Sequence, residues 1–120
     1  MNVAIIDDSL FMRRLIRAAL QDAYPEAKLT EYADAAKALT ELPALAPDLI
    51  TLDMLMPGMT GLEFLAKLRE TTLQSRIIIV TADVQKTIRQ KCVELGANAF
   101  IDKPITFEKL QLALGKIMAV

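Results

Sequence analysis

Four short apolar runs of this sequence each end in side chains that can handle a phosphoryl group. If the runs are parallel strands, their carboxyl ends lie along one edge of a sheet, which is where open α/β sheets bind ligands. Three carboxylates, a hydroxyl and an ammonium group would then meet in one cleft. The runs are 3–6 before Asp7 and Asp8, 49–52 before Asp53, 77–80 before Thr81, and 100–101 before Asp102, Lys103 and Pro104.

Asp7, Asp8 and Asp53 would repel one another in such a cleft. At ~4 Å and an effective dielectric constant near 20, each like-charged pair costs about 4 kcal/mol unless a cation intervenes. The available ligands are oxygens only, and Mg²⁺ accepts a few carboxylates while keeping several waters. The sequence therefore predicts a Mg²⁺ site, with Mn²⁺ as the alternative ion.

Asp53 ends the middle strand of the set and is the predicted nucleophile. An ionised carboxylate needs no general base, and an aspartyl phosphate is a known covalent product of such chemistry. Lys103 would contact a second phosphoryl oxygen and Thr81 a third. Each residue alone could instead serve a helix start or a turn, but their occurrence together at strand ends favours the functional interpretation.

Composition restricts the class of protein. The 120 residues, of which 53% are hydrophobic and 24% charged, suit one globular domain, 1–120, with an aliphatic core. A net charge of -1 argues against direct nucleic-acid or membrane binding. Without histidine and with Cys92 as the single cysteine, catalytic triads, most zinc sites and internal disulfides are excluded. No leader-like or membrane-spanning run is evident, so the cytoplasm is the expected location.

Five strand-like runs alternate with five helical patterns, and these elements must position the reactive side chains. The alternation predicts a parallel sheet covered by helices on both faces, with the β-branched run 77–80 as a central strand. The predicted strands are 3–6, 28–32, 49–52, 77–80 and 99–101. The first predicted helix is capped by Ser9 and runs to Ala23, and the second is capped by Asp34 and runs to Leu42. The third begins at Thr60 and carries Leu62, Leu65, Ala66 and Arg69. The fourth spans 84–95, and the fifth is capped by Thr106.

Local signals mark several boundaries. Pro43 and Pro47 predict the loop before the third strand, Thr60 and Glu63 have the spacing of a capping box, and Gly96 is the expected end of the fourth helix. The remaining conspicuous residues are assigned to packing or solvent. These are Cys92 with Ile88 and Leu95 in one helix stripe, Met54, Met56 and Met59 as flexible packing, Arg13, Arg14 and Arg17 as a solvated helix face, and Phe107, Leu110, Leu114 and Ile117 as the inward face of the last helix.

Together these motifs resemble the receiver domain of two-component response regulators, in particular the stand-alone chemotaxis type. The resemblance covers the whole chain and implies a flavodoxin-like fold, with five parallel strands in the order 2-1-3-4-5 and helices on both faces. The residues that carry it are Asp7-Asp8-Ser9, Met12-Arg13-Arg14, 53–58, Gly61, Thr81-Ala82 and Lys103-Pro104.

The resemblance also implies roles for the site residues. Asp53 would accept a phosphoryl group from a histidine kinase or phosphotransfer protein. Asp8 and Asp53 would bind Mg²⁺ directly with the backbone carbonyl of Leu55, while Asp7 would act mainly through water. A downstream protein would bind the face formed by the fourth helix, the fifth strand and the fifth helix. The remaining implied roles are phosphoryl contacts for Met54, Thr81, Ala82 and Lys103, and a switch role for Thr81 and Phe100.

Three residues near the site should tune this behaviour. Phe100 has only an apolar ring to place, so we expect it to turn inward more often and to populate the active state partly without phosphate. Leu55 cannot orient a hydrolytic water, which predicts slow loss of the phosphoryl group, and Asp83 could oppose that effect.

Three other classes of protein share parts of this pattern. An aspartate-nucleophile phosphohydrolase requires an acid two residues after the nucleophile, where Leu55 stands. A flavin-binding flavodoxin requires a hydroxyl-rich loop where this chain has Asp7 and Asp8. The serious alternative is a receiver-shaped interaction module that is never phosphorylated, so the favoured interpretation is a phosphoacceptor signalling protein rather than an enzyme.

Overall fold

A computed structural model describes residues 1–82 and 85–118, so Asp83 and Val84 lie outside the described residues. No helix in the described part of the chain is long and apolar enough to cross a membrane. Strands and helices alternate along it. In chain order they are β1 (Asn2–Ile6), α1 (Leu10–Ala23), β2 (Lys28–Tyr32), α2 (Ala35–Leu45), β3 (Leu49–Leu52), α3 (Gly61–Leu68), β4 (Arg76–Thr81), α4 (Lys86–Glu94), β5 (Ala99–Asp102) and α5 (Phe107–Ile117).

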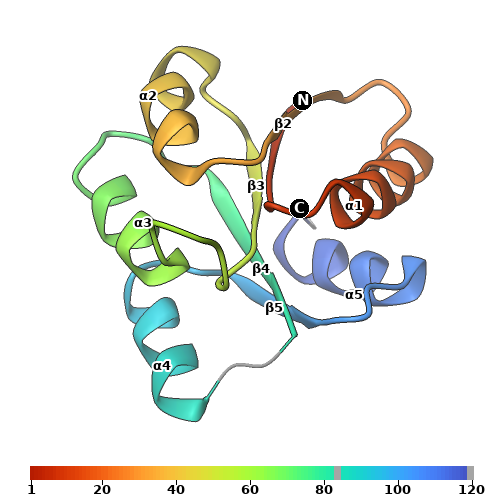
Figure 1. Ribbon diagram of the computed structural model, residues 1–120. Coiled ribbons are helices and arrows are strands. Elements are labelled where there is room, and N and C mark those ends of the chain that lie inside the picture. Colours follow the sequence, from red (N-terminus) through yellow and green to blue (C-terminus); the bar gives the residue numbers. More distant parts are fainter. Residues whose placement is uncertain (83–84, 119–120) are drawn as a thin grey trace.

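The sheet has five parallel strands in the order β2-β1-β3-β4-β5, which confirms the predicted topology. Figure 1 shows α1 and α5 on one face of the sheet and α2, α3 and α4 on the other. The register pairs Ile6 with Leu52 and Leu52 with Ile79, so β1, β3 and β4 end close to one another. The residues that follow these strands therefore share one edge of the sheet.

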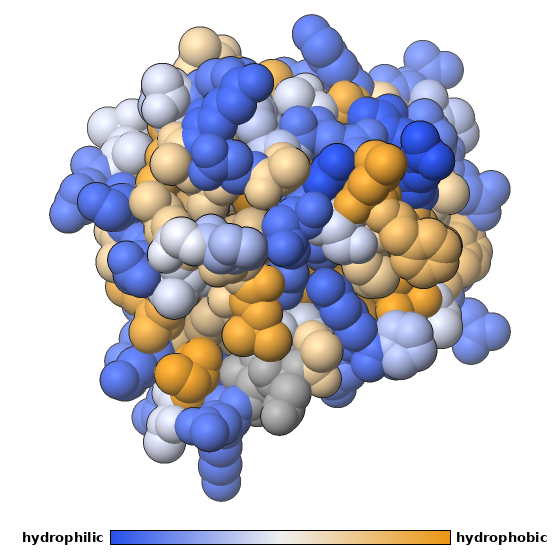
Figure 2. All heavy atoms as spheres, viewed as in Figure 1, coloured by the Kyte–Doolittle hydropathy of each residue, from blue (hydrophilic) through white to orange (hydrophobic). Residues whose placement is uncertain are grey.

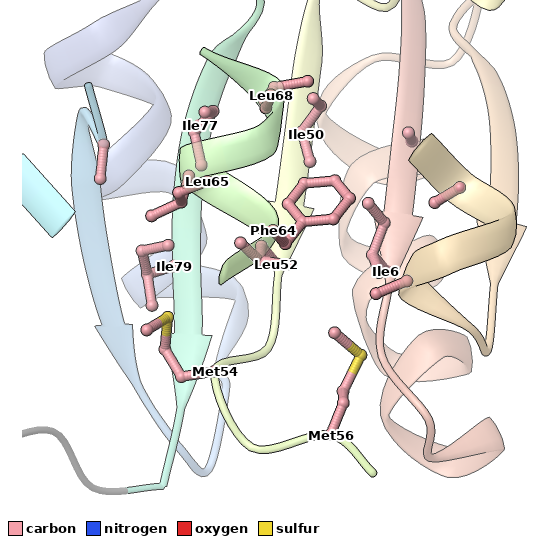
Figure 3. Packing of buried hydrophobic residues seen from close by; sticks show 14 of the residues in the cluster. Ile6, Ile50, Leu52, Met54, Met56, Phe64, Leu65, Leu68, Ile77 and Ile79 are labelled. Atoms are coloured by element: carbon pink, nitrogen blue, oxygen red, sulfur yellow. The ribbon is translucent and has the colours of Figure 1, made fainter. Parts of the chain in front are cut away.

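Two aliphatic cores lie on opposite faces of the sheet because neighbouring strand residues point to opposite sides. In β4, Ile77 and Ile79 belong to the core beneath α2, α3 and α4, whereas Ile78 and Val80 belong to the core beneath α1 and α5. Figure 3 shows Phe64 of α3 over the first core, and this side chain is fully buried. The run 77–80 is thus a central strand covered on both faces, as predicted.

The predicted helix starts are confirmed where a side chain caps the backbone. Each capping oxygen accepts a hydrogen bond from a backbone N–H of the first turn, which satisfies one of the unpaired donors there. The caps are Ser9 to Met12, Asp34 to Ala36, Thr60 to Glu63 and Thr106 to Lys109, at 2.9 to 3.2 Å. Thr60 and Glu63 form the full capping box.

Two predictions about helices are wrong. Helix α2 does not end at Leu42 but includes Pro43 and continues to Leu45, because proline removes one hydrogen bond while the N–H of Ala46 still reaches the carbonyl of Leu42 at 2.8 Å. Phe107 is 39% exposed because it is the first residue of α5, ahead of the buried face formed by Leu110, Ala113 and Leu114.

Large apolar side chains also reach the surface. Figure 2 shows apolar and hydrophilic residues intermingled over the face seen in Figure 1. The most exposed of the apolar ones are Phe11 at 70%, Leu112 at 69% and Leu55 at 62%. Apolar surface is therefore available on α1, on α5 and in the loop that follows β3.

Candidate functional site

Three carboxylates converge at the carboxyl edge of the sheet. One oxygen from each of Asp7, Asp8 and Asp53 lies within 4.8 Å of the others. Asp7 and Asp53 follow the adjacent strands β1 and β3 and are only 1% and 4% exposed, whereas Asp8 is exposed. The structure thus brings together the acids whose types and positions suggested a metal site.

Backbone N–H groups hold the two buried acids. The N–H of Ser9 donates to Asp7 Oδ1 at 2.9 Å, and the N–H of Leu55 donates to Asp53 Oδ1 at 3.1 Å. Each hydrogen bond closes a tight local turn in which the side chain accepts from the backbone two residues ahead. One oxygen of each carboxylate is therefore tied locally, and the second is left for the cluster.

Lys103 faces those second oxygens. Its Nζ lies 3.2 Å from Asp7 Oδ2 and 3.4 Å from Asp53 Oδ2. The N–H of Lys103 donates to the carbonyl of Thr81 at 2.8 Å, which joins the ends of β4 and β5, and the Lys103–Pro104 peptide bond is cis. The neighbouring Asp102 is not part of the cluster, because its side chain is 68% exposed and pairs with Arg89.

The electrostatics of the cluster favour a bound cation. Burial raises the pKa of Asp53 and the charge of Asp7 raises it further, while the Leu55 N–H and Lys103 offset part of this rise. Among residues 1–82 and 85–118, Asp7 Oδ2 is buried and accepts no hydrogen bond, although it lies near Lys103. An all-oxygen set with an unsatisfied buried carboxylate oxygen fits Mg²⁺.

The two residues with an implied switch role lie on neighbouring strands. Thr81 is 1% exposed, and its Oγ1 has no hydrogen-bond partner in the described part of the chain. Phe100 of β5 pairs in register with Ile79 and is half-buried. The guanidinium of Arg89 lies over its ring, 4.6 Å from the ring centroid. The expectation that Phe100 populates an inward state stays a prediction.

Gly61 fixes the loop after Asp53, a role that the sequence analysis missed. A Cβ atom at Gly61 would lie 2.8 Å from the Cα of Met54, closer than such contacts allow, and the Gly61 N–H donates to the Met54 carbonyl at 3.2 Å. Met54 is buried and contacts Cys92, with the two sulfur atoms 3.9 Å apart. Cys92 is a fully buried core residue, and burial raises the pKa of its thiol. The sequence marks Gly61 as part of the receiver-like motif, but the close approach to Met54 has no local signal.

The arginines of α1 do not form a uniformly solvated face, so that prediction is wrong. Arg14 is exposed, but the side chain of Arg13 is 13% exposed and that of Arg17 is 33% exposed. Their Nε atoms donate to Glu31 Oε1 at 3.1 Å and Oε2 at 2.6 Å, respectively. Although burial opposes the charged carboxylate, these hydrogen bonds from Arg17 and Arg13 lower the pKa of Glu31. The pairing joins residues distant in sequence, so helix periodicity could not reveal it.

Known proteins share both this sequence and this structure. The chain is 34% identical over 120 residues to the cyclic di-GMP phosphodiesterase response regulator RpfG of Xanthomonas campestris pv. campestris, covering 98% of the chain but 32% of RpfG. It is 31% identical over 117 residues to the chemotaxis protein CheY of Bacillus subtilis, covering 98% of the chain and 97% of CheY. The structure of the chemotaxis protein CheY4 of Vibrio cholerae superposes with a TM-score of 0.87 at 29% identity, covering 97% of each chain.

The likeness extends over nearly all of the sequence. Residues 3–115 match the response regulator receiver domain. The matched span contains β1 apart from its first residue, all of β2, β3, β4 and β5, and the acidic cluster with Lys103. This chain therefore belongs to the family of response regulator receiver domains.

Proposed function

We propose that Asp53 accepts a phosphoryl group from a histidine kinase or a phosphotransfer protein, and that the chain acts as a phosphorylation-dependent signalling switch. Receiver domains work in such signalling as a family. The observation that carries the assignment to Asp53 is the meeting of its Oδ2 with Lys103 Nζ at 3.4 Å beside the other acids. Asp53 follows β3, the strand between β1 and β4, and the residues that end the neighbouring strands on its two sides, Asp7 and Thr81, are buried.

The residues of the cluster divide the work. Oδ1 of Asp53 is held by the Leu55 N–H, so Oδ2 is the oxygen that attacks phosphorus as the bond to the donor breaks. The ammonium of Lys103 stabilises the charge that gathers on the phosphoryl oxygens. Thr81 supplies a hydroxyl without a partner among the described residues. Met54 and Ala82, which directly follow Asp53 and Thr81 in the sequence, would supply backbone N–H groups to the phosphoryl oxygens. The site would hold Mg²⁺ through Asp7, Asp8, Asp53 and the carbonyl of Leu55.

Mg²⁺ held at this site would supply the positive charge that neutralises the carboxylate and phosphoryl groups, so that two anionic groups can approach one another. Before that, the chain itself keeps the acids in place through burial, local N–H donors and Lys103. Asp53 needs no general base, because its attacking oxygen carries no proton once the carboxylate is ionised. We therefore propose a phosphoacceptor rather than an enzyme that acts on a separate substrate.

The proposed output surface comprises α4, β5 and α5. A groove of about 430 Å³ lies there, and its lining includes Phe100 and the cationic side chains of Arg89 and Lys109. Leu112 of α5 also lines the groove and is 69% exposed. Because Thr81 follows Ile79 by two residues and Ile79 pairs with Phe100, movement at the phosphoryl site has a short path to this groove.

Phosphorylation by a small donor tests the proposal. Incubation with acetyl phosphate and MgCl₂ should add one phosphoryl group to the intact protein, detected by mass spectrometry. Asp53→Ala should abolish the addition, while Asp102→Asn, which changes an exposed acid outside the cluster, should leave it intact. Labelling that persists in Asp53→Ala would assign the phosphoryl group elsewhere. Failure of the native protein to label would favour the interaction module that is never phosphorylated.

A further inference from the structure

One arginine connects the edge strand of the sheet to the acidic cluster. Nη1 of Arg13 donates to the backbone carbonyl of Asp7 at 2.8 Å, while its Nε donates to Glu31 Oε1 at 3.1 Å. The carbonyl of Asp7 belongs to the peptide group that joins Asp7 to Asp8. A single guanidinium on α1 is thus bonded to β2 and to the backbone between two acids of the site.

Glu31 anchors this arginine firmly. Its second oxygen accepts from Arg17 at 2.6 Å, and Arg17 also donates to the carbonyl of Leu29 at 3.3 Å. Charge-assisted hydrogen bonds of this kind are roughly twice as strong as neutral ones, and the planar guanidinium fixes direction as well as distance. Because the side chain of Arg13 is only 13% exposed, solvent screens its pairing weakly.

Of the three acids in the cluster, Asp8 has the side chain least fixed by its own contacts. Asp7 is held by the Ser9 N–H and Asp53 by the Leu55 N–H, but in residues 1–82 and 85–118 no hydrogen bond involves the side chain of Asp8. Asp8 is also exposed, so packing does not hold it. The direction of its carboxylate therefore depends on the backbone to which it is attached.

We propose that Arg13, anchored by Glu31, is a positioning residue that orients the Asp7–Asp8 peptide and thereby aims the Asp8 carboxylate at the cation site. The inference rests on the proposed Mg²⁺ site and adds to it a residue that does not touch the ion. Arg13 acts through the Asp7 carbonyl, so its contribution to cation binding is geometric and opposite in sign to the direct repulsion between its positive charge and the cation.

The direction in which Mg²⁺ affinity changes distinguishes a positioning role of Arg13 from the general effect of its charge. Removing any one of Arg13, Arg14 or Arg17 deletes a positive charge near the acids, which by itself strengthens cation binding. Arg13→Gln should nevertheless weaken Mg²⁺ binding by about tenfold, the lower end of what the loss of an outer partner costs a metal site. Arg17→Gln and Arg14→Gln should leave the dissociation constant within about twofold of the native value, or lower it slightly.

Three measurements on the full chain test the inference. Calorimetric titration with MgCl₂ gives the dissociation constants of the native protein and the three variants. Urea unfolding without metal gives their stabilities, and Arg17→Gln is the matched control because it also removes one arm of the Glu31 pairing but not the bond to Asp7. Amide NMR of the metal-free proteins reports on the Asp8 N–H, which shares the peptide group with the Asp7 carbonyl and should shift in Arg13→Gln alone.

The outcomes are distinct. Weaker Mg²⁺ binding and a shifted Asp8 amide in folded Arg13→Gln, with neither change in Arg17→Gln, support the inference. Equal Mg²⁺ affinities in Arg13→Gln and the native protein overturn it while leaving the proposed function in place. If the native protein binds no Mg²⁺, the proposed function fails as well. Should Arg13→Gln not fold, Arg13→Lys replaces it, because lysine keeps the charge but lacks the planar fork that joins Glu31 to the Asp7 carbonyl, and it must also weaken binding.

Discussion

Replacing Asp53 with asparagine should stabilise the metal-free protein, although it removes the proposed phosphoacceptor. The facing oxygens of Asp7 and Asp53 lie within 4.8 Å of each other, so at an effective dielectric constant near 20 their repulsion costs at least about 3.5 kcal/mol. With the same dielectric constant, attraction between Lys103 and Asp53 at 3.4 Å contributes about 5 kcal/mol of stabilisation. Burial of the Asp53 carboxylate, which is 4% exposed, outweighs the difference, as the raised pKa of Asp53 indicates.

We therefore expect Asp53→Asn to raise the free energy of unfolding at pH 7 by about 1 kcal/mol without metal. The asparagine carbonyl keeps the acceptor for the Leu55 N–H, so local structure is retained. Because the pKa of Asp53 is raised in the folded state, folding favours its protonated form. Its contribution to stability is greatest below its ordinary pKa of 3.8 and falls as pH rises through its folded-state pKa. The advantage of the variant should consequently shrink toward pH 4.

Urea unfolding with and without MgCl₂ measures both effects. Native protein at a Mg²⁺ concentration 100 times its dissociation constant should gain about 2.7 kcal/mol, and the variant much less, so the order of stabilities reverses. Asp102→Asn is the control, since its exposed ion pair should change stability by less than about 1 kcal/mol. Metal-free Asp53→Asn that is less stable than the native protein at pH 7 would refute the reasoning.

Three further changes address the surroundings of Asp53, and Gly115→Ala in α5 is the control for the first of them. Gly61→Ala should lower the free energy of unfolding by about 1 to 3 kcal/mol because its Cβ would press on Met54, whereas Gly115→Ala, with open space around it, should raise it by about 1 kcal/mol. Thr81→Val should change stability by less than about 1 kcal/mol, because its buried hydroxyl has no partner among the described residues, yet it should alter the rate of labelling by acetyl phosphate. Leu55→Asn should speed hydrolysis of the phosphorylated protein, which is measured as the rate of phosphate release. An unchanged rate would remove the basis for assigning slow hydrolysis to this position.

Much of the fold could be predicted because its signals are local. The caps at Ser9, Asp34, Thr60 and Thr106 depend on a side chain and the next few N–H groups, and the residues at strand ends meet wherever the strands are parallel and neighbouring. Features that depend on distant partners were not predictable. The burial of Arg13 requires Glu31, eighteen residues away, and the need for glycine at Gly61 arises only when α3 approaches Met54.

The two separate cores affect how this chain tolerates amino-acid substitutions. The side chains of Ile79 and Phe100 belong with the layer under α3 and α4, whereas those of Val80 and Ile101 belong with the layer under α1 and α5. The sheet is thus a partition, and substitutions made on opposite sides of it share few neighbours, so their energetic effects should be close to additive. Substitutions in the core under α1 and α5 can therefore accumulate with little effect on the packing of Ile79 and Phe100 on the other side of the sheet.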